Sequence, residues 1–453
     1  MNFSGKNVLV YGLGRSGVAA VDLLLSKNAN VFVYEDTKST VTFANDFRVK
    51  RITNLEDVQS KNISLCVVSP GVQIVGNKTI KQLKAWQIEI IPEVELGAMF
   101  IQGDLIAITG TNGKTTSVML LKNLLQKKYD ITFMCGNIGF PISSICNLTN
   151  AKSATVVEVS SFMLETTKNF KPKIACILNI SPDHLTRHKT YKNYIKTKFN
   201  IKNNFDKNNV LILNKNIKNI FVGIRKKYKK RIFKLKIIKN TLKKLKNKYK
   251  IIFFDINKSV KNNKLYFNNK KILLLKKCKL KGEKNYENIL NDLCVCSVLG
   301  LNLPKLKKEI YKFSPPKHRI EFVAKKLGRY FYDDSKATNP DSTICALSGA
   351  KKPVVVLLGG SDKGFCFDEI FDKCQNKIKK VIAFGAVADK IVATCKKHNF
   401  KNVVEYKKLE YAIGNILAET QKNDIVLLSP ANASFDEFTS FEHRGEMFAT
   451  WVK

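Results

Sequence analysis

No apolar run in this sequence approaches the roughly 18 residues that a membrane-spanning helix needs. The amino end also lacks the pattern of a signal peptide, because Met1 to Lys6 leads directly into Val8-Leu9-Val10 and a glycine turn. None of the 11 cysteines stands in a Cys-x-x-Cys pair, and most lie inside apolar runs. We therefore expect reduced core thiols in a cytoplasmic protein that does not enter a membrane.

Acidic residues are scarce, with 37 Asp and Glu against 78 Lys and Arg, and the net charge is +41. The excess is concentrated in residues 215–284, which hold 26 Lys and Arg but only Asp255 and Glu283 as acids. The positive charge alone favours binding to nucleic acid, yet this stretch has no regularly spaced aromatic residues that could stack on bases. Asn and Ile are also enriched there, which is typical of compositional bias on a tolerant surface. We expect no nucleic-acid partner; a basic, nucleic-acid-binding NTPase is the alternative.

A chain of 453 residues is too long to fold around a single hydrophobic core, and its length predicts about three domains. Short apolar runs alternate with helical patterns along its whole length, which predicts an α/β fold of three domains with mostly parallel sheets. Expected strands include 7–11, 30–34, 65–68, 154–159, 174–180, 210–213, 251–255, 330–332, 354–358, 381–384 and 424–428. Expected helices include 16–27, 116–126, 286–299, 342–348 and 409–419. The predicted domains are 1–92 and 315–453, both Rossmann-like, and a P-loop ATPase-like central domain at 93–314.

The segment Gly12-Leu13-Gly14-Arg15-Ser16-Gly17 fits G-x-G-x-x-G between an expected strand and an expected helix. Glu35 and Asp36 end the next expected strand, so the pattern predicts a pocket for the phosphates or ribose of a nucleotide. The nucleotide stays open, and a nicotinamide oxidoreductase is one alternative. Ser69-Pro70-Gly71 follows a further strand at the end where parallel sheets place ligands, although an ordinary turn explains it equally well.

A second glycine loop, Gly110-Thr111-Asn112-Gly113-Lys114-Thr115-Thr116, follows the apolar run that starts at Leu105. In such a loop the glycines let N–H groups face phosphate oxygens, the lysine adds positive charge and the next hydroxyl can bind Mg²⁺. The usual loop has four residues between its glycines, whereas only Thr111 and Asn112 stand here. A simple Gly/Asn turn is therefore the alternative.

Several further motifs occur in a definite order with this loop. They are Glu158-Val159-Ser160-Ser161-Phe162, Asn179 to His184, His318-Arg319, Asp334 to Asn339, Gly359 to Lys363 and Ser429 to Asp436. In this order the chain resembles the ATP-dependent Mur ligases of peptidoglycan synthesis, over all three predicted domains. The 334–339 and 429–436 segments are similar to the branch of that family that adds D-glutamate, and a neighbouring amide-forming ligase is the alternative.

The resemblance implies a bacterial, cytoplasmic enzyme with a defined reaction. ATP would phosphorylate the carboxylate of UDP-N-acetylmuramoyl-L-alanine, and the amine of D-glutamate would displace phosphate from the acyl phosphate to form an amide. Because two anions meet in the first step, positive charge and Mg²⁺ matter more than a nucleophilic side chain. We expect a monomer that acts on these small molecules.

The resemblance also implies residue roles for ATP and metal. The ATP contacts are Gly110, Thr111, Asn112, Gly113, Lys114, Thr115, Thr116, Asn285, Asn288, Arg319, Asp334 and Lys336. The metal ligands are Thr115, Glu158, His184 and a carbamylated Lys198, with Lys196 as the competing position. Lys114, Glu158, His184, Lys198 and Arg319 form the catalytic set. Lys284 replaces the histidine that the family carries beside Asn285, so this position departs from the family pattern.

Substrate contacts follow from the same resemblance. Those for the UDP-linked substrate are Gly14, Arg15, Ser16, Asp36, Thr37, Ser69, Pro70, Gly71, Asn137, Ser160 and His184, so the first glycine turn would bind UDP rather than NAD. Those for D-glutamate are Thr338, Lys363, Ser434 and Phe441. Asn432 and Met163 depart from the usual cysteine and glutamine of the family. Neither position supplies a charge that the reaction needs.

Overall fold

The computed structural model describes residues 2–36, 46–217 and 248–453. They form two compact units. The first unit comprises Met1–Pro182, Arg187–Cys278 and Asn285–Phe313, and the second comprises Asp183–Thr186, Lys279–Lys284 and Ser314–Lys453. Both are α/β with mostly parallel sheets, which confirms the predicted fold class. None of the described helices is long and apolar enough to cross a membrane.

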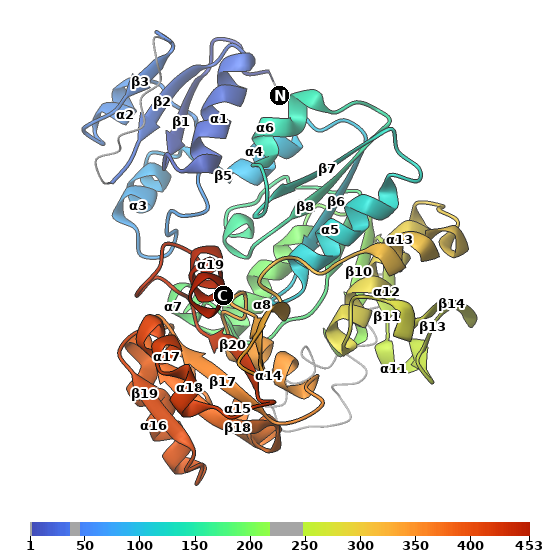
Figure 1. Cartoon of the computed structure of the whole chain (residues 1–453). Helices are drawn as coiled ribbons and strands as arrows, with labels where there is room; N and C mark the ends of the chain where they lie inside the picture. The colour runs from blue at the N-terminus through green and yellow to red at the C-terminus, as the bar shows by residue number, and fades with distance from the viewer. Residues whose placement is uncertain (1, 37–45, 218–247) are drawn as a thin grey trace, which may run out of the picture. The chain divides into compact units, whose positions relative to one another are not determined.

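The first sheet is parallel and has the order β3-β2-β1-β4-β5. Its strands are β1 (Asn7–Tyr11), β2 (Asn30–Tyr34), β3 (Val49–Arg51), β4 (Leu65–Val68) and β5 (Glu89–Pro92). Helix α1 (Arg15–Ser26) packs on one face, and α2 (Asp57–Ser60) and α3 (Lys78–Ala85) pack on the other (Figure 1). Strand order reverses at β1, so the loops after β1, β2 and β4 share one edge.

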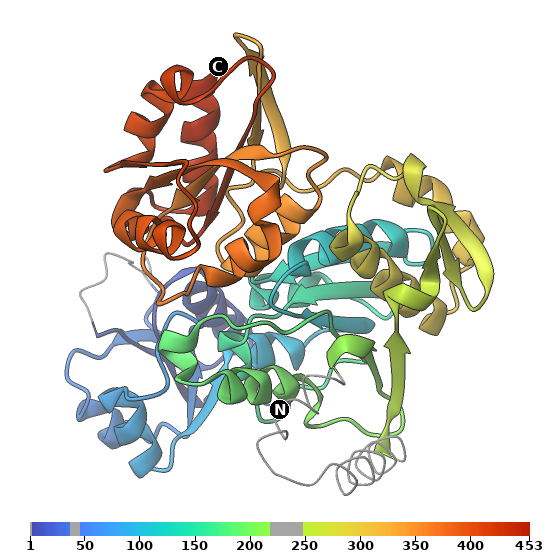
Figure 2. The same ribbon diagram turned by 90° about the horizontal axis from the view of Figure 1, so that it is seen from below.

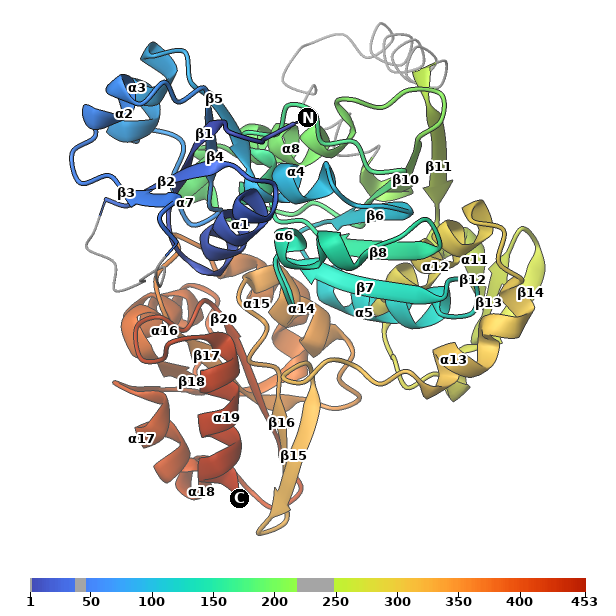
Figure 3. The ribbon, with the colours of Figure 1, turned by 90° about the horizontal axis from the view of Figure 1, so that it is seen from above.

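The second sheet of the first unit is also parallel, with the order β11-β10-β9-β6-β8-β7. Its strands are β6 (Asp104–Thr109), β7 (Ile131–Gly136), β8 (Ser153–Glu158), β9 (Ile174–Ile177), β10 (Val210–Asn214) and β11 (Lys250–Phe254). Helix α5 (Lys114–Leu125) follows β6 and runs beside β7 and β8 (Figure 3). β6 lies between β8 and β9, and the order reverses there as well.

A small antiparallel sheet was missed by the sequence analysis. It consists of β12 (Val260–Lys261), β13 (Lys264–Phe267) and β14 (Lys270–Leu274), within the basic stretch. Its two hairpin turns are the pairs Asn262-Asn263 and Asn268-Asn269, with all four φ angles between 48° and 62°. Asparagine tolerates this left-handed conformation, which two-residue hairpin turns require. Part of the asparagine enrichment in this stretch therefore has a structural cause.

Two helices of the first unit lie near this sheet, α12 (Glu283–Val298) and α13 (Lys307–Lys312). The Tyr311 hydroxyl of α13 accepts a 2.7 Å hydrogen bond from the Leu274 N–H of β14. The predicted helix 286–299 is confirmed as α12.

The sheet of the second unit has the order β15-β16-β20-β17-β18-β19, and β15 is its antiparallel member. Its strands are β15 (Glu321–Lys326), β16 (Arg329–Asp333), β17 (Val354–Gly359), β18 (Ile378–Phe384), β19 (Val403–Tyr406) and β20 (Ile425–Ala431). One face carries α14 (Pro340–Ser348), α15 (Asp368–Cys374) and α16 (Ala388–Lys397). The other carries α17 (Leu409–Gly414), α18 (Ile416–Glu419) and α19 (Phe441–Val452). Figure 2 shows these helices around the orange-to-red sheet.

The helix predicted for 409–419 is confirmed except at one residue. It is divided into α17 and α18 at Asn415, whose φ and ψ are −96° and 6°. The Asn415 amide donates a 2.9 Å hydrogen bond to the Tyr411 carbonyl. A short polar side chain that bonds the local backbone competes with the helical pattern, which explains the break after Gly414.

The cysteines are all free thiols, and nine of the 11 are buried, whereas Cys345 is partly exposed and Cys366 is exposed. Burial raises the pKa of the Cys294 thiol to about 12. The expectation of reduced core thiols is therefore confirmed for nine positions.

Candidate active site

A cavity of about 680 Å³ lies where β1, β2 and β4 end in the first unit. Three loops form most of its wall, namely 12–16, 35–36 and 69–73. Predicted residues that line it are Gly14, Arg15, Ser16, Asp36, Ser69, Pro70, Gly71 and Asn137. Ser160 is absent from the described lining, and Thr37 lies outside the described residues.

Close packing fixes the glycine turn of this cavity. A Cβ on Gly17 would lie 1.9 Å from the Gly12 carbonyl oxygen, so only glycine allows α1 to approach the turn. Glu35 accepts a 2.6 Å bond from the Leu13 N–H. The Tyr11 hydroxyl donates to Asp36, and burial, followed by this bond, raises the pKa of Tyr11. These contacts hold the glycine turn and the end of β2 together at the cavity.

The loop between β6 and α5 has the geometry of a phosphate cradle. Gly113 has φ +84°, and a Cβ there would lie 2.4 Å from Asn288 Oδ1. Asn179 supports the loop through two 2.9 Å bonds, one from the Asn112 N–H and one to the Asn112 carbonyl. Lys114 Nζ donates to the Gly110 and Thr111 carbonyls, both at 2.9 Å. The loop and the start of a 12-residue helix fit a phosphate group.

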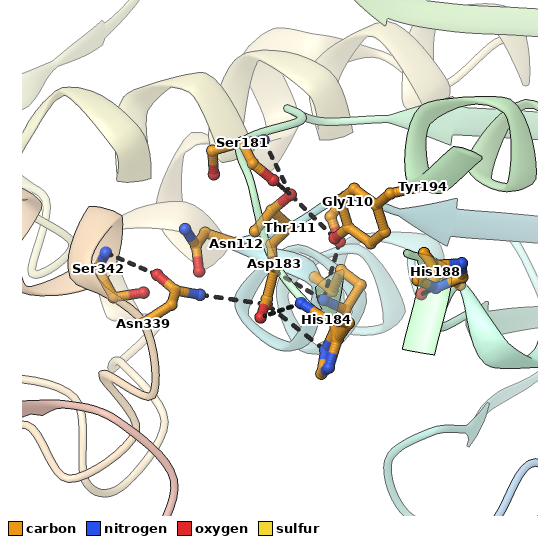
Figure 4. A network of polar contacts seen from close by, with 12 residues as sticks. Gly110, Thr111, Asn112, Ser181, Asp183, His184, His188, Tyr194, Asn339 and Ser342 are labelled. Atoms are coloured by element: carbon orange, nitrogen blue, oxygen red, sulfur yellow. Dashed lines mark hydrogen bonds and ion pairs between the residues drawn. The ribbon is translucent and has the colours of Figure 1, made fainter. Parts of the chain in front are cut away.

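A second layer of hydrogen bonds holds Thr111. Its hydroxyl donates to the Ser181 carbonyl at 3.1 Å and lies 3.0 Å from the Tyr194 hydroxyl. Figure 4 shows these contacts, with His188 on the far side of Tyr194. The role of Tyr194 was missed because it comes from α8 (Tyr191–Lys198), 83 residues along the chain from Thr111.

Glu158 ends β8 and is only 2% exposed. Its two oxygens accept 2.9 Å bonds from the Thr115 hydroxyl and from Asn137 Nδ2. The carboxylate therefore lies beside the phosphate loop at the point where the strand order reverses. Carboxylate and hydroxyl oxygens suit Mg²⁺, so these two residues fit that ion.

His184 belongs to the second compact unit, whereas Glu158 belongs to the first. Its backbone has φ +54°, and its N–H donates a 2.8 Å bond to Asp183 Oδ1. The ring Nε2 is 3.5 Å from Asp183 Oδ2 (Figure 4). The joint metal role of Glu158 and His184 stays a prediction.

Lys198 and Lys196 differ sharply in position. Lys198 is 1% exposed, and its Nζ donates to the Gly110 carbonyl at 2.9 Å and to the Thr109 hydroxyl at 3.3 Å. Its Nζ also lies 4.7 Å from the Tyr194 ring centroid. Lys196 is exposed. Only Lys198, of these two, is beside the phosphate loop.

The second unit brings three predicted loops to one edge of its sheet. Neighbouring strands β16, β20 and β17 end there, and the residues that follow them include Asp334, Ser434 and Lys363. Ser434 is 1% exposed. Lys336 follows β16 too, and its Nζ lies 4.5 Å from the ring centroid of Phe441, the first residue of α19.

Asp334 is buried and accepts a 2.8 Å bond from the Ser429 hydroxyl. Burial raises its pKa to about 7, although the charge of Arg319 opposes this rise. Arg319 lies between His318 and Ile320, whose φ angles are +58° and +49°. A left-handed backbone is unfavourable for a β-branched residue, so this turn is strained.

Two buried groups of the second unit were missed by the sequence analysis. His318 Nδ1 lies 2.6 Å from Asp333 Oδ2, and this hydrogen bond raises the pKa of His318. Arg444 is fully buried and donates to the Asn432 and Ala433 carbonyls at 3.0 and 3.1 Å. Both residues support the loops that carry predicted binders. The sequence marks His318 only as part of the His318-Arg319 motif and does not mark Arg444, because the partners of both residues lie on other elements.

Comparison with known proteins gives the family. Residues 108–296 match the Mur ligase middle domain, and residues 318–432 match the domain described as "Mur ligase, glutamate ligase domain". A UDP-N-acetylmuramoylalanine–D-glutamate ligase of Caldanaerobacter subterraneus subsp. tengcongensis is 36% identical over 99% of this chain and 98% of its own length. The chain belongs to the Mur ligase family.

Other Mur ligases agree with this assignment. A UDP-N-acetylmuramoylalanine–D-glutamate ligase of Koribacter versatilis is 37% identical over 100% of this chain and 98% of its own length. The MurF ligase from Thermotoga maritima, solved in complex with ADP, has the same fold with a TM-score of 0.57. It is 15% identical, and the match covers 99% of this chain and 96% of that one.

Proposed function

We propose that this Mur ligase uses ATP to join D-glutamate to UDP-N-acetylmuramoyl-L-alanine. The observation that carries the proposal is the braced loop Gly110–Thr116 with the Glu158 carboxylate hydrogen-bonded to Thr115. The names of the full-length relatives support the choice of amino acid and nucleotide. We propose the same domain boundaries as above, 1–92, 93–314 and 315–453, and a cytoplasmic monomer.

The chemistry has two steps. An oxygen of the substrate carboxylate bonds to the γ-phosphorus of ATP, while the bond from that phosphorus to the bridging oxygen breaks and ADP leaves. The amine of D-glutamate then bonds to the acyl carbon, phosphate departs with the C–O electron pair, and the nitrogen loses a proton. Both steps gather negative charge, so they depend on fixed cations and donors.

Residues of the first unit act on the phosphates in this proposal. Lys114 places positive charge at the phosphate loop, and the N–H groups at the start of α5 bind phosphate oxygens. Thr115, Glu158 and carbamylated Lys198 would hold Mg²⁺, together with His184. Bound there, Mg²⁺ supplies positive charge that offsets the phosphate oxygens. Burial of the Lys198 amine beside Gly110 supports that residue over Lys196.

Residues of the second unit bind D-glutamate and complete the ATP site in this proposal. D-Glutamate carries two carboxylates, which suit a cation, hydroxyls and backbone donors. Lys363, Thr338, Ser434 and the N–H of Phe441 provide these groups. Arg319 would bind the γ-phosphate, because its planar fork matches phosphate oxygens. Asp334 and Lys336 add ATP contacts from this unit, whereas Asn285 and Asn288 add theirs from the first unit.

The test is phosphate release from ATP with a small panel of substrates. We expect release only when UDP-N-acetylmuramoyl-L-alanine and D-glutamate are both present. Activity with L-lysine, diaminopimelate or D-alanyl-D-alanine instead would indicate a neighbouring Mur ligase. ATP hydrolysis that nucleic acid stimulates and no amino acid affects would favour the nucleic-acid-binding NTPase.

A further inference from the structure

One wall of the cavity is a tight turn, Ser69–Val72, that is held at both ends. The Val72 N–H donates a 3.1 Å bond to the Ser69 carbonyl and closes the turn. The Ser69 hydroxyl donates a 2.6 Å bond to the Gly12 carbonyl. A Cβ on Gly12 would lie 2.8 Å from Val72 Cγ2, so Val72 packs directly on the glycine turn. The position of this turn therefore decides the shape of two walls of the cavity.

Arg187 holds the other side of this turn. Its Nη1 donates to the Pro70 carbonyl at 3.1 Å, and its Nη2 donates to the Val72 carbonyl at 2.7 Å. Nε and Nη2 also donate to Glu165, at 2.9 and 2.7 Å. A planar fork that serves three partners at once is a geometry that lysine cannot reproduce.

The support behind Arg187 is well packed. The side chains of Arg187 and Glu165 are 13% and 8% exposed. The guanidinium lies 4.2 Å from the ring centroid of Phe162, and the His188 ring stacks with Phe162 at 5.8 Å. His188 Nε2 lies 2.9 Å from the Ser161 hydroxyl. Arg187 is thus fixed to the segment that follows β8, where Met163 also lines the cavity.

Arg187 acts on the cavity through two backbone carbonyls. Pro70 and Val72, which carry them, both line the cavity. The guanidinium binds both oxygens but is not among the described lining residues. It therefore holds two lining residues in place and leaves the cavity free.

We propose that Arg187, held by Glu165, is a positioning residue that shapes the Ser69–Val72 turn for the diphosphate of the nucleotide substrate. The identity of that nucleotide rests on the proposed function. Arg187 sets the affinity for the nucleotide and contacts none of the reacting atoms. Its removal therefore changes binding of one substrate out of three.

Arg187→Lys tests this role because it keeps the charge and loses the fork. We expect the KM for UDP-N-acetylmuramoyl-L-alanine to rise about tenfold, since charged hydrogen bonds are lost. The values of kcat and of KM for ATP and D-glutamate should stay within about twofold, as expected for lost ground-state binding. Calorimetry without ATP should show the same rise in the nucleotide Kd.

Glu165→Gln provides a second variant should Arg187→Lys fail to fold, and it should weaken nucleotide binding in the same direction. The double variant should bind no more weakly than the worse single variant, because the two residues act as one unit. Arg48→Lys is the matched control, since Arg48 also pairs with a carboxylate, that of Asp46, and does not line the cavity. An unchanged Kd in both single variants, or a fall in kcat that matches the rise in KM, would overturn the role of Arg187. Failure of the wild-type protein to bind the nucleotide would overturn the proposed function as well.

Discussion

The two six-stranded sheets hold the polar groups at their carboxyl ends differently. In the first unit, Glu158 accepts bonds from Thr115 and Asn137, and Asn179 braces the phosphate loop. In the second unit, both amide atoms of buried Asn432 lack hydrogen-bond partners among the described residues. Arg319 Nε is likewise buried without a partner in the described part of the chain.

The backbone shows the same contrast. The left-handed residue of the phosphate loop is Gly113, for which that conformation is unstrained, whereas the second unit places His318 and Ile320 there. Charge does not differ in this way, because burial raises the pKa of Asp334 in the second unit and that of Glu93 in the first, both to about 7. The first site is held mainly by its own hydrogen bonds, although the buried Thr116 hydroxyl also lacks a partner among the described residues. The second site adds a strained turn to its unpaired groups. Such groups are consistent with the proposal that the second unit binds a ligand.

The largest effect should come from the organised site. Lys114→Ala removes the cation of the phosphate loop, and we expect the rate of D-glutamate ligation to fall about a thousandfold, because charge stabilisation is lost. The measurement is ligation-dependent phosphate release. Lys127→Ala is the control, since Lys127 is half-exposed and pairs with Glu309. Near-normal turnover of the Lys114 variant would contradict the assignment of this loop as the phosphate site.

A smaller loss is expected at Lys198. Lys198→Ala should lower the rate about a hundredfold, and a small added carboxylate should restore part of it by replacing the carbamate at the metal. Lys196→Ala is the matched control, because Lys196 is exposed on the same helix. If only the Lys196 variant lost activity and recovered with added carboxylate, the assignment of the carbamate would be wrong.

At the second site, we expect Asp334 to make the free energy of unfolding depend on pH. The folded-state pKa of Asp334 is about 7, above the ordinary value of 3.8, so the protonated form is favoured on folding. The stabilisation that protonated Asp334 contributes to the folded state is present in full below pH 3.8 and is lost as the pH rises through 7. Between pH 5 and 8 the wild-type protein should lose about 3 kcal/mol of unfolding free energy from this group.

Asp334→Asn should remove that loss, which is measured as the difference between the two unfolding curves at each pH. Glu93→Gln is a useful reference, because burial also raises the pKa of Glu93 to about 7, and Glu93 belongs to the first unit. A difference between wild type and Asp334→Asn that stays constant from pH 5 to 8 would show that folding does not raise the pKa of Asp334.

The parts of the site that could be predicted from the sequence are those that a short local motif encodes. The loops 12–17 and 110–116 were recognised because each glycine pattern lies between a strand and a helix, and one short segment contains the whole signal. Asn179 and Asn288 complete the second loop from elements 67 residues or more away, and family resemblance alone could indicate them.

Long-range contacts set the limit. Arg187 reaches Pro70 across 117 positions, and His318 meets Asp333 across a strained turn. The antiparallel sheet 260–274 was missed because asparagine pairs were interpreted as compositional bias rather than as hairpin turns. The break at Asn415 was missed since the apolar pattern continues through it. In each case a side-chain contact or a backbone conformation decides the structure, and the hydrophobic periodicity of the sequence does not reveal it.

The distribution of the cysteines has a practical consequence. Nine thiols are buried, and burial raises the pKa of those at Cys294 and Cys395 to about 12, so few of them ionise at neutral pH. Cys366 alone is exposed, on the loop before α15 in the second unit. A maleimide dye should therefore attach there first, which offers a fluorescent reporter on the second unit without engineering the rest of the chain.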